Sequence, residues 1–169
     1  MQIVVREAAA GDEGFLWRML LEAAHAGDEV DGVEALRQVP ELARYVEGWG
    51  RPSDLGVVAT NGGGEPVGAA WVRLLVGEDA GYGYVDDTTP ELAIAVDPQR
   101  TGGGIGSQLL ERLLLDAERM FPAVSLSVRA DNPARRLYER FGFQPVADRR
   151  RTNRVGGTSL TLVHRFTGR

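Results

Sequence analysis

Four glycines within five residues form the most informative chemical feature of this sequence. Gly102, Gly103, Gly104 and Gly106 lie between an apolar run and a long amphipathic segment. The first turn of a helix carries unpaired N–H donors and the positive end of the helix dipole. Glycine lets an anion approach that backbone closely because it has no Cβ. A strand, a glycine turn and a helix in this order therefore predict a phosphate or pyrophosphate site.

The spacing of the glycines excludes two nucleotide-binding motifs. A Walker A loop requires Lys-Ser or Lys-Thr after its last glycine, and neither follows here. The dinucleotide pattern G-x-G-x-x-G, counted from Gly102, has Ser107 in place of its last glycine, and counted from Gly104 it has Leu109. The other interpretation is that the glycines only shape a tight turn. A plain turn would need one or two of them, since each costs about 0.5–1 kcal/mol relative to alanine where the backbone is helical.

A short helix that carries Tyr138 is predicted near the end of the chain. Asn132-Pro133 is a favoured helix start, because asparagine caps the first turn and proline suits the first helical position. Leu137 and Phe141 pair at i and i+4 on the apolar side of this helix. Tyr138 lies one residue off that pair. Its ring could belong to the core beside that pair, although the offset of one residue turns it partly away.

The elements that would position these motifs form one mixed α/β domain over residues 1–169, with no repeat and no linker. Apolar and β-branched runs predict seven strands, at residues 3–5, 55–60, 66–76, 91–96, 123–128, 143–147 and 159–166. Spacing and capping predict four helices, namely one capped by Asp12, one opened by Pro40, one over 105–120 and one over 132–141. The turn at 61–64 predicts a hairpin, and residues 77–90 and 149–154 are expected to be exposed loops.

Composition and charge exclude several classes of protein. The chain has no cysteine and a net charge of −5, which argues against thiolate metal sites and against nucleic-acid or anionic-membrane partners. The start of the chain lacks a signal-peptide pattern, and no apolar run approaches the ~20 residues of a membrane span. We therefore expect a cytoplasmic protein. His25 and His164 have no ligand spacing, so no metal is expected. Trp17, Trp49 and Trp71 are expected in the core or a pocket wall.

Together these motifs resemble the GNAT superfamily of N-acetyltransferases. The family motif Q/R-x-x-G-x-G/A follows a strand and precedes a long helix, and residues 101–106 occupy it. Gly104 and Gly106 match, whereas Thr101 replaces the usual Arg or Gln, and Arg100 stands one position early. Residues 128–143 resemble the later motif, in which an asparagine and a tyrosine precede Gly-Phe.

The resemblance implies a fold and a place for acetyl-CoA. The fold is a central mixed, mostly antiparallel sheet of six to seven strands flanked by about four helices, open between the strands near 91–96 and 124–128. The pantetheine arm would pair with the backbone of Ile94, Ala95 and Val96, and Asn132 would bind the pantetheine or adenosine portion. The pyrophosphate would be held by Arg100, Thr101, Gly102, Gly103, Gly104, Ile105, Gly106 and Ser107.

The implied reaction moves an acetyl group from acetyl-CoA to a primary amine. Tyr138 is the candidate general acid for the leaving thiolate, because it fills the family's tyrosine position. Glu91 is the candidate base, and its alternative is a strand-edge residue facing solvent; Asp86 and Asp87 are the reserves. A base matters because a lysine-like amine, with a pKa near 10.4, loses its proton at pH 7 only at a cost of about 4.6 kcal/mol.

The acceptor remains open at this stage. The acidic loop with Glu78, Asp79, Tyr82 and Tyr84 could bind a cationic small molecule or peptide amine, or it could simply be solvated. The basic run at 149–154 reads as a solvated turn. A homodimer is plausible for such families. The alternative function is a non-catalytic acyl-CoA-binding or regulatory module on the same fold.

Overall fold

A computed structural model describes residues 2–24, 30–100, 103–152 and 158–167, with backbone alone for 147–152. Seven strands form one sheet in the order β1-β2-β3-β4-β5-β7-β6. The strands are β1 (Val4–Glu7), β2 (Leu55–Thr60), β3 (Pro66–Arg73), β4 (Glu91–Val96), β5 (Ala123–Arg129), β6 (Gln144–Thr152) and β7 (Thr158–Arg165). The helices are α1 (Glu13–Ala23), α2 (Gly32–Leu36), α3 (Pro40–Ala43), α4 (Ile105–Glu118) and α5 (Arg135–Arg140).

The sheet is mixed and mostly antiparallel, as predicted. Every neighbouring pair of strands is antiparallel except β4 and β5, which are parallel and are joined through α4. A crossover helix is the usual way to connect parallel neighbours. The predicted hairpin is present, because β2 and β3 pair from Leu55↔Val72 to Thr60↔Pro66.

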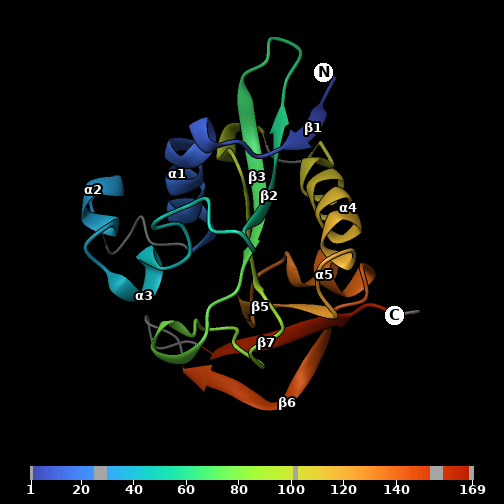
Figure 1. Cartoon of the computed structure of the whole chain (residues 1–169). Helices are drawn as coiled ribbons and strands as arrows, with labels where there is room; N and C mark the ends of the chain where they lie inside the picture. Colours follow the sequence, from blue (N-terminus) through green and yellow to red (C-terminus); the bar gives the residue numbers. More distant parts are fainter. Residues whose placement is uncertain (1, 25–29, 101–102, 153–157, 168–169) are drawn as a thin grey trace.

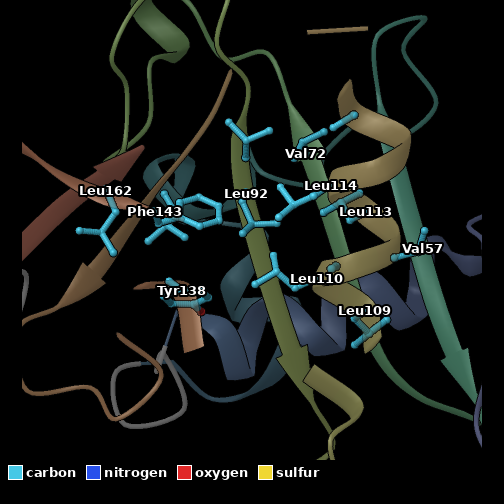
Figure 2. Packing of buried hydrophobic residues seen from close by; sticks show 14 of the residues in the cluster. Val57, Val72, Leu92, Leu109, Leu110, Leu113, Leu114, Tyr138, Phe143 and Leu162 are labelled. Carbon is cyan, nitrogen blue, oxygen red and sulfur yellow. The ribbon is translucent and has the colours of Figure 1, made fainter. Parts of the chain in front are cut away.

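The helices lie on both faces of the sheet, so the protein has two hydrophobic clusters. α4 and α5 pack on one face, and α1, α2 and α3 on the other (Figure 1). Leu109, Leu110 and Leu113 of α4 are fully buried against β2, β3 and β4 (Figure 2). Burying one such side chain stabilises the fold by about 1.5–3 kcal/mol. The predicted apolar stripe of this helix is therefore confirmed from Ile105 to Ala117, whereas Met120 lies beyond the end of α4 and is 46% exposed.

The opposite cluster is built around two tryptophans. Trp17 of α1 is 1% exposed and Trp71 of β3 is fully buried, as expected for core residues. The Trp71 indole N–H donates to the carbonyl of Tyr45 at 2.9 Å. This hydrogen bond ties the segment after α3 to the middle of the sheet.

Beside that cluster lies a buried ion pair. Arg73, at the end of β3, binds both carboxylate oxygens of Asp54 at 2.8 and 3.0 Å. The two side chains are only 1% and 2% exposed. Arg73 also donates to the carbonyls of Arg44 and Glu47, so four of its five N–H donors have partners. Burial alone would raise the pKa of Asp54, but hydrogen bonds from Arg73, Gly50 and Arg51 outweigh it and hold that pKa below its ordinary value.

Three local predictions were wrong. Asp12 occupies the N-cap position of α1, but its carboxylate makes no capping hydrogen bond to that helix and binds the guanidinium of Arg6 at 2.7 Å instead. The predicted basic turn is largely strand, because β6 runs to Thr152 and pairs Arg150 with Leu160 of β7; Arg154 lies outside the described residues. The helix after Asn132 begins only at Arg135.

Candidate active site

β4 and β5 separate almost as soon as they meet. Glu91 and Ser125 form the only register pair between these strands in the part of the chain that the structure describes. The Ser125 N–H also donates to the carbonyl of Pro90 at 3.0 Å. Beyond this point the two strands diverge, which confirms the predicted opening in the sheet.

The opening leaves one edge of β4 available for pairing. β3 occupies the other edge, from Gly68↔Val96 to Arg73↔Glu91. Ile94, Ala95 and Val96 are half-buried, and toward β5 they have no ladder partner among the described strands. Unpaired strand edges attract extended chains with N–H and C=O groups. The geometry therefore fits the predicted role of these three residues, which stays a prediction.

α4 starts beside the wide end of this opening. Its N-cap is Gly104, whose φ of +75° is a left-handed backbone conformation that residues other than glycine rarely adopt. Gly104 has no side chain with which to cap the helix, and the N–H groups of Ile105, Gly106 and Ser107 lie in the first turn, where no intrahelical acceptor is available. Gly103 and Gly104 are exposed, and a Cβ at either would meet nothing within 4 Å. The residues present therefore fit a diphosphate; Thr101 and Gly102 lie outside the described residues.

Arg100 contributes a cation near this helix start, but the cation has a partner. Its guanidinium binds the carboxylate of Glu65, in the hairpin turn, at 3.0 Å. The two side chains are 31% and 63% exposed, and an exposed pair of this kind contributes at most about 1 kcal/mol. Arg100 could exchange this partner for a phosphate, so its predicted binding role stays open to test.

Tyr138 lies on the α4–α5 face of the sheet and is 8% exposed (Figure 2). Its ring meets Phe143 edge-on at 5.9 Å between centroids. Burial raises the pKa of its hydroxyl to about 12, and no described residue forms a hydrogen bond with that hydroxyl. A Cβ on Gly106 would lie 3.5 Å from Leu137, so the first turn of α4 packs next to the helix that carries Tyr138.

Glu91 does not face solvent, so the alternative interpretation of this residue was wrong. It is 1% exposed, and it lies on the sheet face opposite Tyr138. Its oxygens accept hydrogen bonds from the Tyr45 hydroxyl at 2.8 Å and from the N–H groups of Gly81 and Gly83 at 2.8 and 2.9 Å. Burial raises the pKa of Glu91 despite these hydrogen bonds. Its role as a base is untested.

The loop 77–90 is only partly exposed, contrary to expectation. Glu78, Asp79 and Asp87 face solvent, whereas Gly83 and Thr89 are buried. The predicted reserve bases have local partners: Asp86 accepts from the Thr88 N–H and hydroxyl, and Asp87 accepts from the Tyr84 hydroxyl at 2.6 Å.

Asn132 uses its side-chain oxygen locally. That oxygen accepts from the Ala134 N–H at 2.8 Å, which shapes the turn before α5. The predicted role of Asn132 in binding the pantetheine or adenosine portion stays a prediction. His164 packs between Phe143 and Phe166, and His25 lies outside the described residues. Within the described ranges, no group of three or more His, Asp or Glu residues could hold a metal ion, and none of the helices is long and apolar enough to span a bilayer.

Sequence reasoning missed the residues around Glu91. Tyr45, Gly81, Gly83 and Ser125 come from three separate segments, and they meet at the closed end of the opening. The one available signal was the pattern Gly-Tyr-Gly a few residues before a glutamate that begins a strand. Two glycine N–H groups at i and i+2 can converge on one carboxylate.

Comparisons with known proteins agree with this geometry. Residues 52–145 match the family described as Acetyltransferase (GNAT) domain. N-alpha-acetyltransferase RimI of Mycobacterium tuberculosis is 41% identical over 112 residues, which are 66% of this chain and 66% of that protein. A mycothiol acetyltransferase of Beutenbergia cavernae is 32% identical over 137 residues, 80% of this chain and 42% of that protein. The chain thus spans less than two thirds of either relative.

The fold has close structural counterparts. The yncA acetyltransferase of Salmonella typhimurium, solved with its cofactor acetyl-CoA, has a TM-score of 0.71 at 20% identity, over 99% of this chain and 95% of that one. At this identity the likeness shows the fold. The family model matches more than half of the sequence, which shows membership of the family as well as the fold. This chain belongs to the GNAT acetyltransferase family.

Proposed function

We propose that the protein transfers an acetyl group from acetyl-CoA to a primary amine by direct attack in a ternary complex. The observation that carries the proposal is the opening between β4 and β5, with the glycine-capped start of α4 at its wide end. An extended thioester could pair with β4 while its diphosphate meets the N–H groups after Gly104. Tyr138 lies on one face of this arrangement and Glu91 on the other.

The chemistry replaces the C–S bond of a thioester with a C–N bond. The amine nitrogen attacks the acetyl carbon, CoA leaves as the thiolate, and one proton departs from the amine. Tyr138 would give its proton to the leaving sulfur, and the proton lost by the amine finally restores the phenol. A hydroxyl with a pKa of about 12 stays protonated at neutral pH, so the donor is ready without prior titration.

Glu91 would take an earlier proton, the one that the ammonium form must lose before its nitrogen can attack, and would release it to solvent. A carboxylate offers about four acceptor positions, and three are occupied here. The fourth could accept a proton through an ordered water, because the side chain itself is almost fully buried. The raised pKa makes this carboxylate a stronger base than an exposed one.

An α-amine is the acceptor that best fits a base that is buried and acts through a water. An α-amino group has a pKa of about 7.7–8.0, so its deprotonation at pH 7 costs only about 1 kcal/mol, far less than for a lysine. The relative named an N-alpha-acetyltransferase supports the same class of acceptor. We therefore propose a polypeptide α-amine as the first acceptor to try.

A thiol-release assay with acetyl-CoA across an amine panel tests the proposal. The panel pairs a short peptide that has a free α-amine and no lysine with a blocked peptide that has one lysine, and adds a polyamine, an aminoglycoside and a free amino acid. We expect turnover of the free α-amine and little with the blocked peptide. Binding of acetyl-CoA with no turnover of any amine would favour the non-catalytic module instead.

Calorimetry on Gly104→Val tests the diphosphate site. A side chain in the left-handed conformation costs roughly 1–2 kcal/mol, so the loop should move away from the geometry that exposes its N–H groups. We expect acetyl-CoA affinity to fall about tenfold, which corresponds to ~1.4 kcal/mol. Gly48→Val is the matched control, since Gly48 has a φ of +71° and open space around it. Equal losses in both variants would mean that the loop has no special role.

A further inference from the structure

Several described groups remain outside the catalytic scheme, and the most connected of them surround the Glu91 carboxylate. The Tyr45 hydroxyl donates to that carboxylate at 2.8 Å and accepts from the Tyr82 N–H at 3.0 Å. Gly81 and Gly83 donate to it from the same three-residue segment. A single buried side chain of β4 and one hydroxyl after α3 therefore fix the whole segment Gly81–Tyr82–Gly83.

Gly81 and Gly83 fit in this place because they have no side chains. A Cβ on Gly81 would come under 3.0 Å from both Glu91 oxygens. A Cβ on Gly83 would come 2.8 Å from the backbone carbon of Leu126 in β5. Real Cβ atoms essentially never approach other atoms this closely. The neighbour of Gly83 is strand backbone, so that position requires glycine, whereas a side chain at Gly81 would force the Glu91 carboxylate or the Tyr45 hydroxyl to shift.

β5 holds the same segment from the other side of the opening. The Ser125 hydroxyl, fully buried, donates to the Gly83 carbonyl at 2.7 Å. Leu126, against which Gly83 packs, lies one residue past the last β4–β5 pair, at the point where the strands begin to separate. The segment thus bridges β4 and β5 at the closed end of the opening.

The bridge lies on one particular face of the sheet. Tyr45 and Tyr82 belong to the cluster under α1–α3, whereas Tyr138 belongs to the cluster under α4 and α5. A thioester held in the opening would have its leaving sulfur toward Tyr138, so the attacking amine would come from the face that carries the bridge. The bridge is then part of the wall that the amine meets.

We propose that Tyr45 and Ser125 are positioning residues for the amine acceptor: together with Glu91 they hold segment 81–83 across the closed end of the β4/β5 opening. This inference rests on the proposed function for the identity of the site. It predicts that loosening the bridge weakens use of the amine while leaving acetyl-CoA binding intact. Arg44 supports the same segment from outside, through a hydrogen bond to the Ala80 carbonyl at 2.8 Å.

Two conservative variants test the bridge by hydrogen exchange. Tyr45→Phe removes the hydroxyl and keeps the ring, and Ser125→Ala removes only the hydroxyl. We expect amide exchange at residues 81–83 to accelerate about fivefold or more in each variant. This factor corresponds to the net contribution of one lost hydrogen bond. Thr60→Val is the matched control, since it removes another buried hydroxyl, bonded to the Val4 carbonyl, far from the bridge. Unchanged exchange in both variants would refute the bridge.

The same variants separate the bridge from the general reaction. With the free α-amine peptide as probe, we expect its KM to rise about fivefold or more by the same reasoning. The acetyl-CoA dissociation constant should stay within about twofold, as for groups at separate sites. Faster exchange with an unchanged peptide KM would overturn the positioning role. If the unaltered protein acetylated no amine, the proposed function would be refuted. Amide hydrogen exchange at residues 81–83 would still show whether the bridge exists.

Discussion

Replacing Tyr138 with phenylalanine is expected to lower kcat about a hundredfold or more, the usual contribution of a positioned general acid. The substitution keeps the ring that packs against Phe143 and removes only the hydroxyl. Since no described residue bonds that hydroxyl, little stability should be lost with it. We expect the affinity for acetyl-CoA to change by about twofold at most. Thiol release at saturating substrates and calorimetry measure the two quantities.

The pH profile gives this prediction a second readout. Tyr138 has a pKa of about 12, so its phenol remains the protonated donor across the neutral and mildly alkaline range. Activity should show no alkaline decline from this residue below that value. Wild-type turnover by Tyr138→Phe would leave Tyr138 as a core aromatic only. An alkaline decline near pH 9–10 that disappears in the variant would mean that its pKa is not raised by burial.

The largest loss of stability is expected from Asp54→Asn. The variant is nearly isosteric, but it leaves the buried guanidinium of Arg73 without a counter-charge. Removing one partner of a buried pair typically costs about 3–5 kcal/mol. Urea unfolding should therefore give a free energy of unfolding lower by roughly this amount. The matched control is Glu34→Gln, because Glu34 is 93% exposed and lies 4.0 Å from Arg37; its loss should be near zero.

The direction of the pH dependence follows from the lowered pKa of Asp54. A carboxyl group with a lower pKa in the folded state stabilises the fold above its unfolded pKa of about 3.9. That stabilisation is lost as the pH falls through the folded value. The difference between the wild type and Asp54→Asn should therefore be full at neutral pH and shrink below about pH 4. A difference that is constant with pH would mean that the carboxylate charge contributes nothing.

Local patterns predicted the parts of this fold that depend on neighbouring residues. The apolar stripe of α4 repeats at helical spacing, and Leu109 and Leu113 are buried where that spacing places them. The glycines before this helix predicted a special backbone, and Gly104 has one. The mostly antiparallel sheet and the opening next to β4 followed from the family resemblance rather than from any single residue.

Contacts between distant segments could not be predicted in the same way. Tyr45 and Glu91 are separated by 46 positions, and nothing in either local sequence indicates the other. Aspartate is a residue type that favours helix caps, yet the carboxylate of Asp12 binds the guanidinium of Arg6 instead. Charge favours solvent and so predicts a turn for the arginine run at the end of β6, whereas the backbone of this run completes a ladder with β7.

Among the described residues, a single register pair joins the four strands β1–β4 to the three strands β5–β7 of this sheet. A molecule seated between these two groups of strands would touch both and supply attachments that the empty protein lacks. Its binding free energy would then appear as resistance to heat, about 2.7 kcal/mol at a concentration of a hundred times the dissociation constant. Because β4 and β5 are joined at only one end, the melting temperature should report sensitively whether a ligand is bound between them.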